Sequence, residues 1–344
     1  MSLTTALILL AVALLVVLAG HGLWSTRRAL PRRAEPEAAT ARSERVEPSF
    51  GVLPAAAGVA APVLPAIARR SGARIDALID AIATLALEAP ISGEMLLTHL
   101  PASRRAGSKP FQIEGLNATS GEWEPVSLGQ RYGELQAGVQ LANRSGALNE
   151  IEYSEFVQKL QAMADAIGAV ADFPDMLDVV ARARELDAFA SPHDATLSVR
   201  LRANSAAWSV GYIQQCAARH GFVPGATAGR LVLPAAEDGA PPVLVLAFDA
   251  QAALADDPAS APVRELSLVL DVAQTPQEVE PFAAWHQAIN ALVDDMDASA
   301  VDDEGRPLTL QHFASIADEL NKLYRALESH DMAAGTAVAR RLFQ

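Results

Sequence analysis

This 344-residue chain has almost no cysteine, and it lacks the motifs of the common enzyme classes. Cys216 is the only cysteine, which excludes a disulfide framework and a multi-cysteine zinc site and fits a reducing compartment. The seven histidines lack metal-ligand spacing, and there is no phosphate loop, dinucleotide fingerprint, His-Glu-x-x-His pair or Gly-x-Ser-x-Gly elbow. We therefore expect a protein that is not an enzyme, with no catalytic residues, no metal, no cofactor and no small-molecule substrate.

Charge is absent from the first 24 residues, since no side chain from Leu3 to Trp24 carries a formal charge. A helix over this stretch would be about 33 Å long, enough to cross a bilayer core of ~30 Å. A cleaved signal peptide would need a basic stretch before the apolar run and a small-x-small site after it, and neither is present. A buried core helix is the other alternative, but it rarely runs this long without a polar face. We predict that residues 1–24 form a transmembrane helix.

Basic residues follow the predicted span at once. Arg27, Arg28, Arg32 and Arg33 come within ten residues of it, so the positive-inside rule predicts that the rest of the chain lies in the cytoplasm. Residues 25–73 are rich in Ala, Pro, Arg and Glu, and prolines at this density block helix interiors and favour an extended linker. Within this linker, Gly51–Ile67 is apolar but so rich in Ala, Pro and Gly that it makes a poor core and a poor helix.

The net charge of −14 is unevenly distributed. Nine arginines and four glutamates between Trp24 and Arg74 give a local balance of +5, so residues 75–344 carry −19. This excess repels nucleic acid and anionic lipid, and it favours a basic or apolar peptide as partner. The alternative is that the acidity only keeps the folded part soluble.

Two segments of similar layout follow the linker, at residues 74–190 and 191–330, and residues 331–344 remain as a C-terminal tail. Strands with period-2 alternation, such as Thr196–Arg202, and helices with apolar stripes give each segment the order β-α-β-β-β-α-β-α. We interpret this as an internal repeat. Hairpin spacing of the middle strands predicts antiparallel sheets with helices on one face, so the expected fold class is α+β with two tandem domains.

Several helix boundaries are indicated by capping residues. The helix that bears Trp285 is predicted to begin with Thr275 as N-cap, Pro276 at the first helical position and Glu278 at the third. Thr309 is predicted to cap the last helix. At the start of the first segment, Ile75–Leu87 fits both a helix and a strand.

The sheet face that the helices leave uncovered is the candidate site. In the second segment this face is expected to carry small apolar and hydroxyl side chains, without the Lys and Glu usual on a solvated sheet: Thr196, Ser198, Val232, Val245, Ala247, Ser267 and Val269. Such a face is a candidate groove for an apolar peptide. The alternative is that the first segment or the linker packs on it. The equivalent face of the first segment, with Gln136, Gly138 and Gln140, is more polar and is expected to bind less well.

Two regions of the chain resemble the ZipA family of bacterial cell-division proteins. One is the apolar span that ends in His21-Gly22-Leu23-Trp24-Ser25-Thr26-Arg27-Arg28. The other is residues 195–327, by the order of strands and helices, the His220-Gly221-Phe222 turn and the sequence Arg306-Pro307-Leu308-Thr309. Together they cover about half of the chain. Residues 74–190 then look like a degenerate ZipA-like domain inserted before the C-terminal domain.

The resemblance implies that residues 191–330 bind the C-terminal tail of the tubulin-like protein FtsZ in a shallow apolar groove on the open sheet face. Groove positions of the family fall near Thr196, Ser198, Thr227, Ala247, Asp249, Ser267 and Val269, with Arg306 at the edge. The chain departs from the family where Val269 replaces an expected aromatic, where methionines are missing near Thr227 and Asp249, and where a lysine is replaced near Gln251. Because such grooves gain affinity from aromatic and Met contacts, a shallower groove with weaker binding is expected.

The resemblance also implies a cellular role. The protein would be a single-pass protein of the inner membrane at the division septum, with a periplasmic N-terminus and cytoplasmic domains. It would tether and stabilise FtsZ filaments, the Z-ring, without catalysis. The expected partners are the FtsZ tail and the inner membrane, and no nucleic acid. The alternative is a membrane-anchored scaffold of the division or envelope machinery that binds a different protein.

Overall fold

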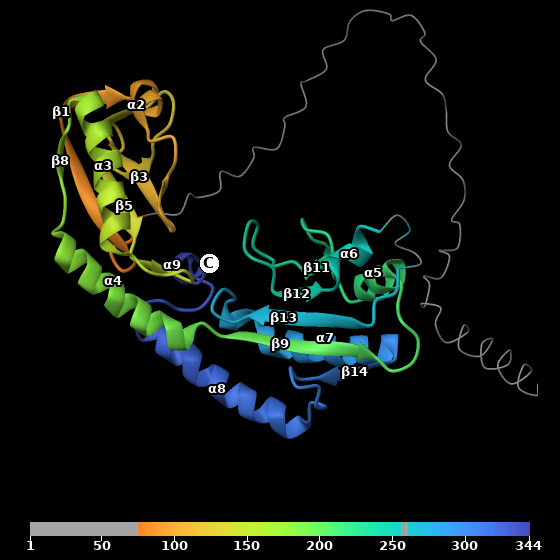
Figure 1. Cartoon of the computed structure of the whole chain (residues 1–344). Coiled ribbons are helices and arrows are strands. Elements are labelled where there is room, and N and C mark those ends of the chain that lie inside the picture. The colour runs from red at the N-terminus through yellow and green to blue at the C-terminus, as the bar shows by residue number, and fades with distance from the viewer. Residues whose placement is uncertain (1–74, 256, 258–260) are drawn as a thin grey trace, which may run out of the picture.

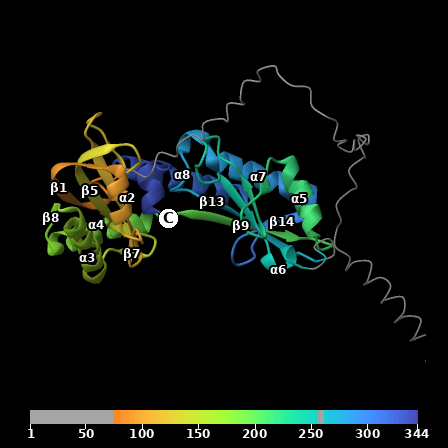
Figure 2. The same ribbon diagram turned by 90° about the horizontal axis from the view of Figure 1, so that it is seen from above.

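The computed structural model describes residues 75–255, 257 and 261–344. These residues form two units, each built on a six-stranded antiparallel sheet, and the two units lie side by side with the end of the chain between them (Figures 1 and 2). We call residues 75–190 the first unit and residues 195–330 the second unit. The expected α+β class with antiparallel sheets is confirmed for the described residues.

The first unit has a sheet in the order β2-β3-β5-β1-β8, with β4 paired to β3. The segment that fitted both a helix and a strand begins with a turn, in which the backbone N–H of Leu78 donates to Asp76, and becomes a strand at Asp80. Helix α3 covers one face, where the ring of Phe156 packs edge-on against Phe111 at 5.4 Å. The elements are β1 (Asp80–Ser92), α2 (Gly93–His99), β2 (Arg105–Ala106), β3 (Lys109–Asn117), β4 (Trp123–Pro125), β5 (Arg131–Gln140), β6 (Ala142–Asn143), β7 (Gly146–Ala147), α3 (Glu150–Ile167), β8 (Val170–Asp172) and α4 (Met176–Ala190).

A capping box at the start of α3 ties this helix to the β2–β3 turn. The Asn149 side chain accepts from the backbone of Glu152, and Glu152 accepts in return from the backbone N–H of Asn149 at 3.2 Å. The other carboxylate oxygen of Glu152 accepts from the backbone N–H and the hydroxyl of Ser108 at 2.8 and 2.7 Å. Burial raises the pKa of Glu152, but these hydrogen bonds outweigh burial and leave the pKa below its ordinary value.

Replacing Glu152 by glutamine is expected to destabilise the protein by about 1–2 kcal/mol at pH 7, because hydrogen bonds to a charged group are lost. A lowered folded-state pKa means that the carboxylate stabilises the fold above its unfolded pKa of about 4.3, and that this stabilisation fades as pH falls through the folded pKa. Urea unfolding at pH 7 and pH 3.5 measures the difference, which should shrink at the lower pH. Glu150→Gln, at a surface pair with Arg184, is the control, and an equal effect of the two variants would contradict the assignment.

The second unit has a sheet in the order β10-β11-β12-β13-β9-β14. Helices α5 and α7 lie on one side of it (Figure 2), and the buried indole N–H groups of Trp208 and Trp285 donate to the backbone carbonyls of Met296 and Leu268 at 2.9 and 3.3 Å. The elements are β9 (Thr196–Ala203), α5 (Val210–Arg219), β10 (Val223–Pro224), β11 (Arg230–Leu233), β12 (Leu244–Ala247), α6 (Ala250–Ala253), β13 (Glu265–Asp271), α7 (Pro281–Met296), β14 (Ala298–Val301) and α8 (Leu310–Glu328), with 3₁₀ turns at Ser191–His193 and Gln277–Val279.

The two sheets share one strand order. In the first unit β1 lies between β5 and β8, and in the second β9 lies between β13 and β14, with every pair antiparallel. The order β3-β5-β1-β8 thus corresponds to β12-β13-β9-β14. Two identical dipeptides, Glu134-Leu135 on β5 and Glu265-Leu266 on β13, fall at equivalent pairs, since Leu135 lies opposite Leu85 and Leu266 lies opposite Leu201. This correspondence supports the interpretation of an internal repeat.

One predicted helix start is wrong. Helix α7 begins at Pro281, whereas the sequence placed its first turn at Thr275 and Pro276. Glu280, with φ of 48°, separates the preceding 3₁₀ turn from the helix. The Thr275 hydroxyl is buried and donates to the backbone carbonyl of Asp271 at 2.8 Å, so it belongs to the end of β13. Pro276 and Pro281 both suit the first position of a helix. Because Thr275 is buried at the end of β13, the helix begins at Pro281.

The predicted transmembrane helix 1–24 and the predicted linker 25–73 lie outside the described residues. None of the helices formed by the described residues is both long enough and apolar enough to span a bilayer.

The C-terminal tail ends in a short helix, α9 (Ala337–Leu342), that contacts both units. The guanidinium of Arg341 makes two contacts of 2.8 and 2.5 Å with the carboxylate of Asp80, and both residues are buried, with exposed fractions of 7% and 1%. The Gln140 amide of the first unit donates to the Arg341 carbonyl at 2.7 Å, and the Gln274 amide of the second unit donates to the Phe343 carbonyl at 2.6 Å. These bonds explain why Gln140, expected on an open face, is buried.

A second link between the units lies at the end of the second sheet. Arg144, in the hairpin of β6 and β7, contacts Asp194 at 2.6 Å and Asp271 at 2.8 Å. Burial raises the pKa of Asp271, and the hydrogen bond and charge of Arg144 oppose that rise. The first unit therefore borders the second sheet at the end of β13, and the rest of the open face stays clear of these contacts.

Candidate peptide-binding face

Strand alternation gives the second sheet one buried and one open face. On β13 the side chains of Leu266, Leu268 and Leu270 are buried toward the helices. Ser267 and Val269 point to the other side and are half-buried. The same alternation holds along each strand because successive side chains of a strand point to opposite faces.

Valines line up across the open face. Register places Val223 opposite Val232, Val232 opposite Val245, and Val245 opposite Val269, which in turn lies opposite Ser198. We call the four valines the valine row. At about 4.8 Å per strand, the line from Val223 on β10 through the valine row to Ser198 on β9 is about 19 Å long. It is the length of a helix of about 13 residues or of an extended segment of about six residues.

A mixed row lies beside the valine row. It contains Arg230, Ala247, Ser267 and Arg200, each opposite the next across the strands. The Ser267 hydroxyl lies 3.1 Å from that of Ser198, which joins the two rows. Arg230 at one end and the Ser267 and Ser198 hydroxyls beside the small centre make the face amphipathic, so apolar side chains and acceptor groups of a peptide both find partners.

The Arg200 guanidinium bends away from the centre of the face. It donates to the backbone carbonyls of Asp302 and Asp303, the former at 2.9 Å. The turn that follows β14 is therefore held beside the Ser198 end of the valine row, and its acidic side chains border the face there.

A hollow of about 520 Å³ adjoins the other half of the valine row. Val232 and Val245 form part of its lining, and the loop between β11 and β12 supplies one wall with Glu237 and Asp238. Thr227, in the loop between β10 and β11, lies on the opposite side. The hollow has an apolar part and a charged rim, as in ligand sites that take an apolar anchor.

The structure brings most of the predicted site residues together. Thr227 lines the hollow, whereas Asp249 follows β12 and caps α6 by accepting from the backbone of Gln251 at 2.8 Å. Arg306 lies in the turn after β14, where it pairs with Asp302 at 2.8 Å and with Glu304. The remaining seven share the open face: Thr196, Ser198, Val232, Val245, Ala247, Ser267 and Val269.

Sequence reasoning missed three residues of the two rows on this face. Val223 forms the end of the valine row and is 45% exposed. Arg230 and Arg200 lie on the mixed row. The alternation of β9 and β11 places both arginines on the open side, a signal already in the sequence, whereas the two-residue strand β10 is too short to show a period.

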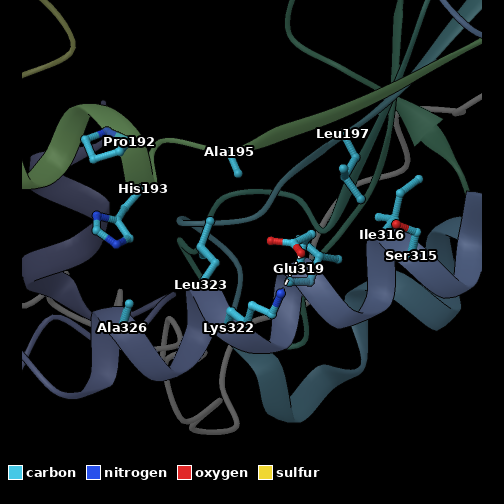
Figure 3. A pocket seen from close by; sticks show the side chains of 11 residues that line it. Pro192, His193, Ala195, Leu197, Ser315, Ile316, Glu319, Lys322, Leu323 and Ala326 are labelled. Carbon is cyan, nitrogen blue, oxygen red and sulfur yellow. Dashed lines mark hydrogen bonds and ion pairs between the residues drawn. The ribbon is translucent and has the colours of Figure 1, made fainter.

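A second hollow of about 520 Å³ lies on the helical side of the unit, between β9 and α8 (Figure 3). Leu197 points from β9 toward α8, and Ile316 and Leu323 point from α8 toward β9. Glu319 and Lys322 form an ion pair of 2.7 Å at its rim. This hollow is also apolar inside and charged outside, so it is the competing candidate site.

Within the described ranges, no group of three or more His, Cys, Asp or Glu side chains is arranged to hold a metal ion. Neither a search of protein-family models nor a search of curated proteins finds a match to the chain.

Proposed function

We propose that the protein is a non-catalytic membrane tether whose second unit binds the C-terminal tail of FtsZ on its open sheet face. The observation that carries this proposal is the valine row: four apolar side chains in register across four strands, half-buried or exposed. A contiguous apolar strip on an otherwise acidic unit is typical of a docking surface for a peptide.

The shape of the face predicts how the tail binds. The row crosses the strands, so a peptide that follows it lies across the sheet and gains side-chain contacts, with no strand added to an edge. Val269 is smaller than the aromatic that the family resemblance leads one to expect, and no methionine lines the hollow. Affinity in the micromolar range, about −8 kcal/mol, is therefore expected.

Modest affinity is sufficient for a tether. In this proposal residues 1–24 anchor the chain in the inner membrane and residues 25–73 set the reach. Many copies confined to one membrane, facing a filament with many tails, raise the overall avidity by factors of 10² to 10⁴.

A titration of residues 75–344 with a labelled FtsZ tail peptide tests the proposal, with fluorescence anisotropy as the readout. Saturable binding with a dissociation constant of about 1–100 μM is expected, and a scrambled peptide of the same composition should bind at least tenfold more weakly. No binding at millimolar peptide would reject the proposal.

The second candidate function is a membrane-anchored scaffold that binds another protein. The hollow between β9 and α8 favours it, because its apolar lining lies on the opposite side of the sheet from the valine row. A partner helix in that hollow would leave the open face free. Retained mid-cell localisation after loss of FtsZ binding would support the scaffold.

A further inference from the structure

The longest uncharged run after residue 24 lies just before the first unit. From Pro48 to Ala68 no side chain is charged, and Val, Leu, Ala and Pro dominate. We call residues 50–68 the apolar segment. Three arginines, Arg69, Arg70 and Arg74, separate it from the first unit. Exposing such a segment to water costs free energy that an apolar surface on the same molecule can recover.

A series of contacts links the start of the first unit to the wall of the open-face hollow. The backbone N–H of Asp76 donates to Asp80 at 2.8 Å, and Asp80 pairs with Arg341. The next residue of α9, Arg340, contacts the Glu237 carboxylate at 3.0 Å. Glu237 belongs to the hollow that adjoins the valine row. Four successive contacts or bonds thus connect the first described residues to the candidate site.

The connection is long enough for the apolar segment to reach the face. Residues 69–74 span up to about 20 Å when extended, and the 19 residues of the segment, from 50 to 68, exceed the length of the valine row several-fold. The charges also fit: residues 191–330 hold 19 acidic and 8 basic side chains, whereas the residues flanking the segment on its C-terminal side are arginines.

We propose that the apolar segment docks on the valine row of its own molecule and competes there with the partner peptide. The docking follows from the segment and the face alone, whereas the competition rests on the proposed function. The segment carries no charge to desolvate, and Val52, Leu53, Val63 and Leu64 supply side chains that match the row. The apolar segment then covers the valine row until a partner peptide displaces it.

The expected strength follows from effective concentration. A connection of a few residues within one chain gives an effective concentration of the order of 1 mM. A segment that binds the face with a dissociation constant of about 0.3 mM would then be docked about three-quarters of the time, which weakens partner binding about fourfold. A partner tail presented in many copies on a filament gains enough avidity to overcome this fourfold weakening, whereas a single free peptide does not.

The competition is tested in the full-length chain in lipid nanodiscs, with the labelled FtsZ tail peptide as probe. One variant replaces residues 50–68 by a Gly/Ser sequence of the same length, and a matched control replaces residues 31–49 in the same way. About fourfold tighter binding is expected for the first variant and no change for the control. Equal affinities of all three proteins would overturn the proposal.

The docking itself is tested without peptide. A benzophenone amino acid in place of the exposed Ser198 should cross-link on illumination to residues 50–68, and one in place of Thr84, exposed on the first unit, should not. Mixing ¹⁵N-labelled and unlabelled chains shows by mass spectrometry whether the cross-link forms within one molecule. Cross-links that join two molecules, or none from position 198, would overturn the proposal. If the cross-link forms in one molecule but no variant binds the FtsZ tail, the docking stands and the proposed function fails.

Discussion

Replacing Arg341 by alanine is expected to destabilise the protein by about 3–5 kcal/mol, because it leaves the Asp80 carboxylate buried without its cation. Asp80 has an exposed fraction of 1%, and Arg341 is its partner through both guanidinium contacts. In urea unfolding, with a slope of about 1–3 kcal/mol per molar, the midpoint should fall by more than about 1 M. Because Arg341 contacts Asp80 at the start of β1 and Gln140 at the end of β5, hydrogen exchange should also rise in these two strands together.

Arg340→Ala is the matched control. This neighbouring arginine pairs with Glu237, whose side chain is 69% exposed, so its loss is expected to cost about 1 kcal/mol or less. The double variant Asp80→Leu with Arg341→Met should recover much of the lost stability, since apolar groups of similar size replace the pair. If Arg341→Ala costs no more than Arg340→Ala, the pair is not the buried anchor of the tail.

Replacing Val269 by aspartate is expected to weaken binding of the FtsZ tail at least 100-fold. Val269 lies in the valine row between Val245 and Ser198, so a bound peptide would cover the new carboxylate and leave it without a partner. A cost of about 3 kcal/mol corresponds to that factor. Fluorescence anisotropy with the labelled peptide measures it, and circular dichroism checks that the variant is folded.

Two variants serve as controls for this effect. Val223→Asp, at the 45% exposed end of the row, should lower affinity less than about fivefold because its carboxylate keeps contact with water. Thr84→Asp, on the polar open face of the first unit, should leave affinity unchanged. Equal losses in Val269→Asp and Thr84→Asp, or no loss in Val269→Asp, would place the binding site elsewhere.

The second sheet could be predicted well because its strands alternate strictly. Thr196–Arg202 alternates over seven residues, and the side chains placed on the open face from that pattern are on that face in the structure. A one-residue error in register would have moved all of them, so period-2 alternation carries most of the information about the candidate site.

Several features of the fold depend on tertiary contacts and could not be predicted from the sequence. Thr275 and Pro276 look like a helix start, but burial of the Thr275 hydroxyl at the end of β13 moves the start to Pro281. Residues 331–344 look like a tail, because the partner of Arg341 lies 261 residues earlier in the chain, at Asp80. No local pattern encodes a pairing at that separation. Val223 escaped notice for a similar reason, since only pairing with Val232 makes it part of a strand.

The measurement that tests the central claim most directly is methyl NMR of residues 75–344, labelled at Val and Leu, during titration with the FtsZ tail peptide. Binding on the open face predicts saturable shifts at Val232, Val245 and Val269, which lie in one row across the sheet. Shifts confined to Leu197 and Leu323, which line the hollow between β9 and α8, or no shifts at millimolar peptide, would contradict it.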